Sequence, residues 1–169
     1  IAAVLRSPKP HTTFKAGDAT FRFYLGDCLD VLASLPESSL SAIVTSPPYN
    51  LGIRYRSYDD AIPRSRYLEW TGEWVKRAAA ALATDGSLFL NVGAKPTDPW
   101  TALDVAQAVR PHLRLQNTIH WIKSIAIEKA LAGARAGLDE DLAVGHYKPI
   151  NSKRFLHDCH EFEIGRAHV

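Results

Sequence analysis

Four consecutive residues present groups that could do chemistry: Ser46, Pro47, Pro48 and Tyr49. They follow the run 41–45, whose apolar and β-branched residues predict a buried strand. A residue before a proline avoids the helical region, and prolines have no backbone N–H, so 46–49 should form a stiff extended hook. The hook offers a hydroxyl, carbonyl oxygens and an aromatic ring where open α/β sheets bind ligands. A proline turn with a surface tyrosine remains the alternative for these four residues alone.

The segments around the hook alternate between strands and helices, which predicts one α/β domain with a mostly parallel sheet. We expect an irregular lead-in over 1–19 and an irregular or partly helical segment over 124–154. Expected strands cover 20–25, 41–46, 86–93, 113–121 and a segment from about 159; expected helices cover 28–35, 64–83 and 100–109.

The composition is ordinary for a globular domain: 169 residues, 46% hydrophobic and 22% charged. The formal net charge of +2 is too small to indicate nucleic-acid binding by itself, so any such contact must come from local basic clusters. Two cysteines are too few for a disulfide framework, and a reducing cytoplasm is therefore expected. No apolar run reaches the ~18 residues of a membrane span, so no membrane association is expected.

Five segments match a known family in their order along the chain. They are Gly26-Asp27-Cys28-Leu29, 41–50, 86–91, 117–123 and 155–162. With these motifs the chain resembles the permuted (β-type) DNA amino methyltransferases, which depend on S-adenosylmethionine and modify N4 of cytosine or N6 of adenine. The resemblance implies a partial Rossmann-like methyltransferase sheet, mostly parallel, with helices on both faces.

The resemblance also implies a chemistry for the hook, with S-adenosyl-L-methionine as cofactor and double-stranded DNA as substrate. Ser46 Oγ and the Pro47 carbonyl would accept hydrogen bonds from the amino group of a flipped base, in a hook that Pro48 stiffens. Tyr49 would stack on that base. Serine at position 46 leans towards cytosine N4, although adenine N6 stays open.

The family's cofactor contact maps onto Asp27 and Cys28, with Asp27 at the adenine end. Asp27 can equally cap the helix that follows it, and both roles are compatible. DNA contacts are expected from the basic and polar positions Asn50, Arg54, Arg56, Lys123, Lys148 and Asn151. Solvated polar loops are the alternative for these residues. No metal site is expected, because on a strand His157 and Cys159 would face away from His160.

The chain departs from the family at its C-terminal end. The glycine-rich cofactor motif that follows these segments in permuted members does not occur in the sequence. We therefore expect residues 1–163 to be the catalytic half of a DNA methylase domain without its C-terminal cofactor-binding half, and the fragment itself to be inactive. Residues 164–169 match an in-frame translation of a sequencing adapter and are expected to be an artefact.

The expected gap in the sheet lies between strands 20–25 and 41–46, so the first strand should be displaced or should leave an unpaired edge. A cognate restriction endonuclease is a candidate partner, and the sequence does not indicate an oligomeric state. Two alternatives from other classes remain: a non-catalytic DNA-binding fragment, and a methyltransferase that acts on RNA or protein.

Overall fold

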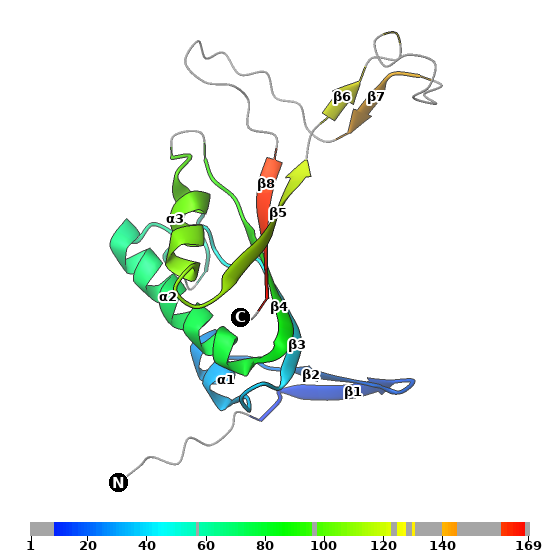
Figure 1. Cartoon of the computed structure of the whole chain (residues 1–169), viewed down its shortest axis with the longest axis vertical. Coiled ribbons are helices and arrows are strands. Elements are labelled where there is room, and N and C mark those ends of the chain that lie inside the picture. The colour runs from blue at the N-terminus through cyan, green and yellow to red at the C-terminus, as the bar shows by residue number, and fades with distance from the viewer. Residues whose placement is uncertain are drawn as a thin grey trace.

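The computed structural model describes residues 9–56, 58–95, 98–122, 125–127, 130, 140–144 and 160–167. Figure 1 shows its helices and strands. In chain order they are β1 (Thr12–Ala16), β2 (Ala19–Phe23), α1 (Cys28–Ser34), β3 (Leu40–Thr45), α2 (Arg64–Ala81), β4 (Leu82–Val92), α3 (Thr101–Val109), β5 (Arg114–Ile122), β6 (Ile125–Ile127), β7 (Leu142–Val144) and β8 (His160–Ala167). Within the described part of the chain, no helix has the length and hydropathy of a membrane span.

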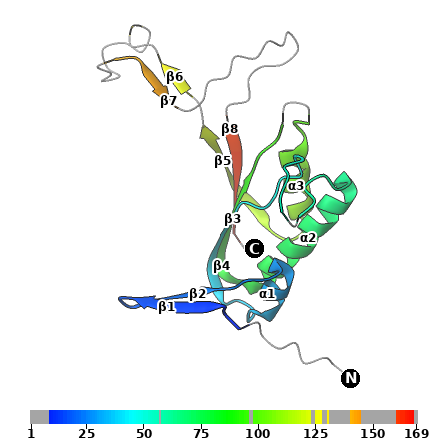
Figure 2. The same cartoon turned by 180° about the vertical axis from the view of Figure 1, so that it is seen from behind.

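The main sheet has four strands in the order β3-β4-β8-β5. β3 and β4 are parallel, and β8 runs antiparallel to both β4 and β5, so β3, β4 and β5 share one direction. This confirms the α/β class and the mostly parallel sheet. The sequence predicts helices on both faces; in the described residues α1, α2 and α3 lie on the same side of the sheet (Figures 1 and 2).

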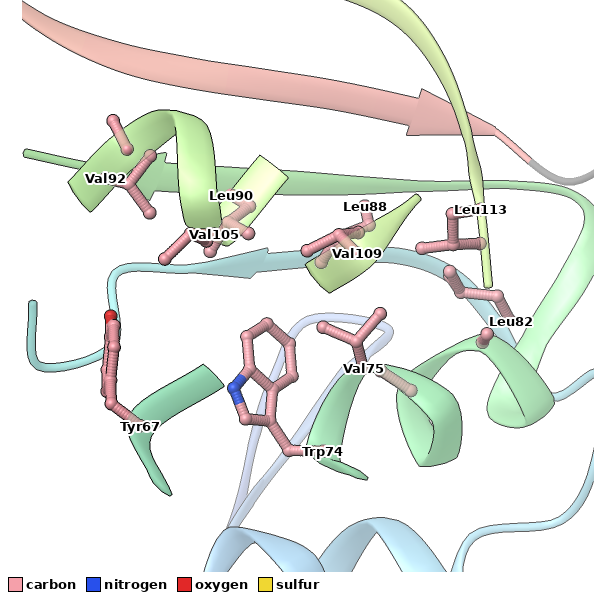
Figure 3. Packing of buried hydrophobic residues seen from close by; sticks show 13 residues of the cluster. Tyr67, Trp74, Val75, Leu82, Leu88, Leu90, Val92, Val105, Val109 and Leu113 are labelled. Atoms are coloured by element: carbon pink, nitrogen blue, oxygen red, sulfur yellow. The ribbon is translucent and has the colours of Figure 1, made fainter. Parts of the chain in front are cut away.

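The hydrophobic core lies between β4 and the helices α2 and α3 (Figure 3). Every second side chain of β4, from Leu88 through Leu90 to Val92, is fully buried, as the two-residue repeat of a strand requires. They meet Val75 of α2 and Val105 of α3, and each such buried side chain stabilises the fold by about 1.5–3 kcal/mol. This packing fixes the carboxyl ends of β3 and β4 side by side.

The expected irregular lead-in over 1–19 is wrong for residues 12–16, because β1 pairs antiparallel with β2. Gly17, with φ +58°, permits the tight turn between them. The expected bounds of the second helix (64–83) and of the strand after it (86–93) also differ from the structure: α2 ends at Ala81, and β4 begins at Leu82, so it includes Asp85 and Gly86. Gly86 serves the sheet instead, since a Cβ there would lie 2.8 Å from the Leu40 carbonyl of β3.

The β1–β2 hairpin forms a sheet of its own, and no strand of the described residues pairs with the outer edge of β3. The expectation of a displaced first strand and an unpaired edge is therefore confirmed. Within the segment expected to be irregular, β6 and β7 pair antiparallel. The final strand is found as β8, and it runs on through residues 164–167, which the sequence assigns to an adapter-derived tail.

Candidate functional site

The hook, residues 46–49, leaves the carboxyl end of β3 beside the end of β4. Ser46 Oγ lies 2.7 Å from Tyr49 Oη, so one hydrogen bond closes the hook on itself. Asn91, near the end of β4, donates from Nδ2 to the same Tyr49 oxygen at 3.0 Å. Because the Tyr49 oxygen accepts this bond, its own hydrogen can go to Ser46 Oγ. The structure thus brings the predicted Ser46 and Tyr49 together.

A second contact, from α2, fixes the middle of the hook at Pro48. Tyr67 Oη on α2 donates to the Pro48 carbonyl at 2.9 Å, and the Tyr67 hydroxyl points at the chain that follows β3 (Figure 3). Burial raises the pKa of Tyr67 far above its usual value, so this donor keeps its proton. No donor among the described residues reaches the Pro47 carbonyl. The hook therefore has one carbonyl held by the fold and another available.

Asp60 organises the chain that follows the hook. It is 2% exposed, and its carboxylate accepts the backbone N–H groups of Asn50, Leu51 and Ile53 at 2.9, 3.1 and 3.0 Å. Asn50 itself has φ +58° and donates from Nδ2 to the Ile62 carbonyl at 2.9 Å. The side-chain amide expected to contact DNA is thus engaged within this loop.

The remaining predicted DNA contacts are only partly within the described residues. Arg54 and Arg56 are exposed, as a contact to a phosphate backbone requires. Lys123, Lys148 and Asn151 lie outside the described residues, as do His157 and Cys159. In the portion that is described, no three His, Cys, Asp or Glu side chains gather as a metal site would need.

A cavity of about 350 Å³ lies between α1, β3 and α2, and Pro47 of the hook forms part of its wall. Its lining includes Gly26, Cys28, Ile43, Trp70 and Trp74. Asp27, next to the cavity, accepts the Leu29 N–H at 2.8 Å and is the helix cap that the sequence predicts. Partial burial, and after it the Asp27 carboxylate, raise the pKa of the Cys28 thiol, so this wall stays uncharged.

Trp74, which lines the cavity, has a buried polar atom that meets no partner in the described part of the chain. Trp74 is 5% exposed, and its buried Nε1–H meets no acceptor among the described residues. Leaving such a donor unpaired costs about 1–3 kcal/mol. A planar heterocycle would fit an apolar, aromatic cavity of this kind.

Three of the residues that build this site are not predicted from the sequence: Asp60, Tyr67 and Asn91. Asn91 belongs to the matched segment 86–91, but nothing there indicates its contact with Tyr49. Tyr67 falls within the expected helix 64–83, but nothing in the sequence indicates its contact with Pro48. An acidic pair, Asp59-Asp60, after a loop of arginines and tyrosines is the signal that could have indicated Asp60.

The geometry suits a planar amino compound. Ser46 Oγ and the Pro47 carbonyl can each accept one hydrogen bond from an NH₂ group, and Tyr49 can offer a flat ring beside them. The cavity reaches the same point from the other side, because Pro47 belongs to both. Two reactants could therefore meet at the hook.

Comparisons with known proteins identify the family of the chain. A family model described as DNA methylase matches residues 40–162. Type II methyltransferase M.MjaVI of Methanocaldococcus jannaschii is 44% identical over 94 residues, which are 52% of this chain and 47% of that protein. Type II methyltransferase M.SfiI of Streptomyces fimbriatus is 32% identical over 166 residues, 85% of this chain and 39% of that protein. The chain thus spans less than half the length of these relatives.

Solved structures show the same fold. The PvuII DNA methyltransferase, described as cytosine-N4-specific, superposes with a TM-score of 0.56 at 17% identity, over 86% of this chain and 48% of that one. A putative DNA modification methylase of Thermus thermophilus, solved with S-adenosyl-L-methionine, gives 0.55 at 20% identity, over 85% and 51%. Because the family match covers most of the sequence and includes the hook, the chain belongs to the DNA methylase family of N6/N4 methyltransferases.

Proposed function

We propose that the full-length protein transfers a methyl group from S-adenosyl-L-methionine to the exocyclic amino group of a base flipped out of duplex DNA, cytosine at N4 or adenine at N6. The observation that supports this most is the hook itself. It places a hydroxyl, an available carbonyl and an aromatic ring within four residues, at a strand end that adjoins a cavity. Family membership makes this reaction the expected one.

The hook acts on the nucleophile. An exocyclic amino nitrogen reacts poorly because its lone pair is delocalised into the ring. Hydrogen bonds from its two hydrogens to Ser46 Oγ and the Pro47 carbonyl favour the pyramidal nitrogen of the transition state. Tyr67 holds the neighbouring Pro48 carbonyl, so these acceptors are in place before the base arrives. The amino group loses one proton on methylation, and solvent can take it.

Tyr49 offsets part of the cost of base flipping. Extruding a base costs a few kcal/mol, and stacking on one aromatic ring returns about 1–3 kcal/mol. The bonds from Ser46 and Asn91 to the Tyr49 hydroxyl fix the ring in advance, so little side-chain entropy is lost on stacking.

The cofactor fits the cavity between α1, β3 and α2. Gly26, Cys28 and Trp70 would enclose its adenine. Asp27, which accepts the Leu29 N–H, lies beside the cavity, where its carboxylate would accept a further bond from the cofactor. When bound, the cofactor supplies an electrophilic sulfonium methyl group.

The finer assignments follow from the same proposal. Ser46 favours cytosine N4 over adenine N6, and Arg54 and Arg56 are exposed to contact the DNA backbone. The relatives are named type II methyltransferases, so a cognate restriction endonuclease is the proposed partner in function. Action on cellular DNA would place the protein in the cytoplasm.

Labelled S-adenosyl-L-methionine and duplex DNA test the proposal in the full-length protein, with the methylated nucleoside identified after digestion. N4-methylcytosine or N6-methyladenine would support it and decide between the two targets. Label that appears in RNA or protein but not in DNA would contradict it.

The substitution Ser46→Ala should lower the single-turnover methylation rate by about 10²-fold, because the hydroxyl that is lost accepts a hydrogen bond in the transition state. DNA affinity should change little. Ser41→Ala is the matched control, since it removes an exposed hydroxyl at the other end of β3. A fully active Ser46→Ala variant would remove Ser46 from the mechanism.

A further inference from the structure

We propose that Asp60 is a positioning residue, whose carboxylate holds the turn after Tyr49 and thereby sets the Tyr49 ring for the flipped base. The inference rests on the proposed function and adds to it a residue that makes no contact with the base. Asp60 lies eleven positions beyond Tyr49 in the sequence, in a loop that no sequence motif assigns.

The Asp60 carboxylate is fully used by the loop. Its Oδ1 accepts the Asn50 N–H at 2.9 Å, and its Oδ2 accepts those of Leu51 and Ile53 at 3.1 and 3.0 Å. The Asp60 carbonyl accepts the Gly52 N–H at 2.8 Å. Four successive backbone donors therefore end on one buried residue. Bonds to a carboxylate are stronger than bonds to a neutral oxygen, so the loop has one preferred shape.

That shape includes a backbone conformation that needs support. Asn50, directly after Tyr49, has φ +58°, in the left-handed region that residues with a Cβ rarely adopt, asparagine more readily than most. The Asp60 bonds to the Asn50 and Leu51 amides hold the peptide groups on both sides of this residue. The turn at Asn50 decides the direction in which the chain leaves the hook, and so the orientation of Tyr49.

The turn is also tied to the helix that holds the hook. Asn50 Nδ2 donates to the Ile62 carbonyl, one residue before the N-cap Pro63 of α2. Tyr67, the fourth residue of α2, donates to the Pro48 carbonyl. Hook, turn and helix thus form a closed ring of contacts, and Asp60 supplies the largest number of its bonds to the turn.

Asp60→Asn tests the proposal with a minimal change of shape. The amide has one acceptor oxygen, so its NH₂ group must face either the Asn50 N–H or those of Leu51 and Ile53, and a donor then meets a donor. Asp59→Asn is the matched control. It removes the same charge one position away, and its amide oxygen can still accept the Ala61 N–H that Asp59 Oδ1 binds at 3.0 Å.

Three quantities are measured in the full-length protein: the single-turnover methylation rate, the DNA dissociation constant, and the fluorescence of 2-aminopurine at the target position, which rises on flipping. In Asp60→Asn we expect the rate to fall about 10²-fold and the fluorescence change to shrink, with DNA affinity nearly unchanged. Asp59→Asn should stay within about twofold of wild type in all three.

A purely structural role for Asp60 predicts a different result. Val105→Ala, a truncation in the core at α3, lowers stability and removes none of the hydrogen bonds of this loop. If Asp60→Asn loses rate only as much as a Val105→Ala variant of equal melting temperature, or not at all, the proposal is overturned. If the wild type is inactive, both the proposed function and the role of Asp60 are contradicted. If the wild type is active and Asp60→Asn is unaffected, only the role of Asp60 is contradicted.

A second pair of variants keeps the proposal testable if Asp60→Asn does not fold. Asn50→Ala and Asn50→Gly both lose the bond to Ile62, but only glycine accepts φ +58° without strain. The proposal expects the alanine variant to flip and methylate more slowly than the glycine variant. Equal rates would show that the turn does not set Tyr49.

Discussion

At the scale of single residues, the hydroxyl groups of the site stabilise the shape of the hook and also form part of the surface that would meet a base. The Ser46 and Tyr49 hydroxyls bond to each other, and the Tyr49 oxygen also receives Asn91. A hydroxyl has two lone pairs and a hydrogen, so Ser46 can keep this bond and still accept one from a base. The ring of Tyr49 and its hydroxyl therefore have separable roles.

Two substitutions at Tyr49 separate those roles. Tyr49→Ala removes the stacking surface and should weaken productive capture of the target base about 10- to 100-fold, in line with the free energy of one stack. Tyr49→Phe keeps the ring and loses the bonds of the hydroxyl to Ser46 and Asn91, so it should weaken capture much less. The fluorescence of 2-aminopurine at the target position measures capture directly. Equal losses in both variants would mean that the hydroxyl, and not the ring, is needed.

At the scale of elements, α2 positions most of the site. Tyr67 holds the hook, and Trp70 and Trp74 line the cavity. Arg64, the first residue of the helix, pairs with Asp98, which precedes α3, and with Asp104 of α3. Thr101 of α3 also accepts a bond from Arg64 at 3.0 Å. The helix is therefore fixed at its start by charges and along its length by the core.

The connection between α2 and the hook gives a pH-dependent prediction. Burial raises the pKa of Tyr67 above its usual value of 10, so the folded state keeps this proton where the unfolded state loses it. The Tyr67 contribution to stability is then fully present below pH 10 and declines as the pH rises above it. Urea unfolding should show wild type more stable than Tyr67→Phe by about 1 kcal/mol near neutral pH, with the gap narrowing in alkaline solution. A gap that stays constant would contradict the bond to Pro48.

The sequence predicts the elements better than the contacts between them. The strand before the hook and the helix that Asp27 caps follow from local signals: β-branched runs, prolines and a capping carboxylate. β1 escapes prediction because a five-residue exposed strand in a polar segment has no apolar face to identify it. Asp60 and Asn91 escape it because their partners lie ten and forty-two positions away, and no local pattern encodes such pairs.

At the scale of the whole molecule, several exposed apolar side chains lie on the face of the sheet opposite the core. Val44 pairs with Phe89, Phe89 with Gly165, and Gly165 with Asn117, so these positions lie on one face, opposite the core. Trp121, four residues after Asn117, lies on the same face. Val44 is 76% and Trp121 53% exposed. The unpaired outer edge of β3 borders this face.

This exposure bears on cofactor binding. The cavity is bordered by β3, the strand whose outer edge is unpaired, and the chain spans less than half the length of its curated relatives. We expect a polypeptide of these 169 residues to show no measurable heat on titration with S-adenosyl-L-methionine, because the glycine-rich approach to the cofactor is not among them. The full-length protein should bind. Micromolar binding by the 169-residue polypeptide would mean that these residues suffice for the cofactor site.

The same exposure predicts self-association. An unpaired strand edge with an exposed apolar side chain such as Val44 is a template for pairing with another chain, so the 169-residue polypeptide should sediment as a mixture of monomer and larger species that shifts with concentration. Val44→Lys places a charge at that edge and removes apolar surface, and it should restore the monomer with little change in stability. Leu103→Lys is the matched control, since it adds the same charge at an exposed apolar position of α3, on the other side of the sheet. If both lysines suppress association equally, net charge is the cause, and the edge of β3 is not where the chains meet.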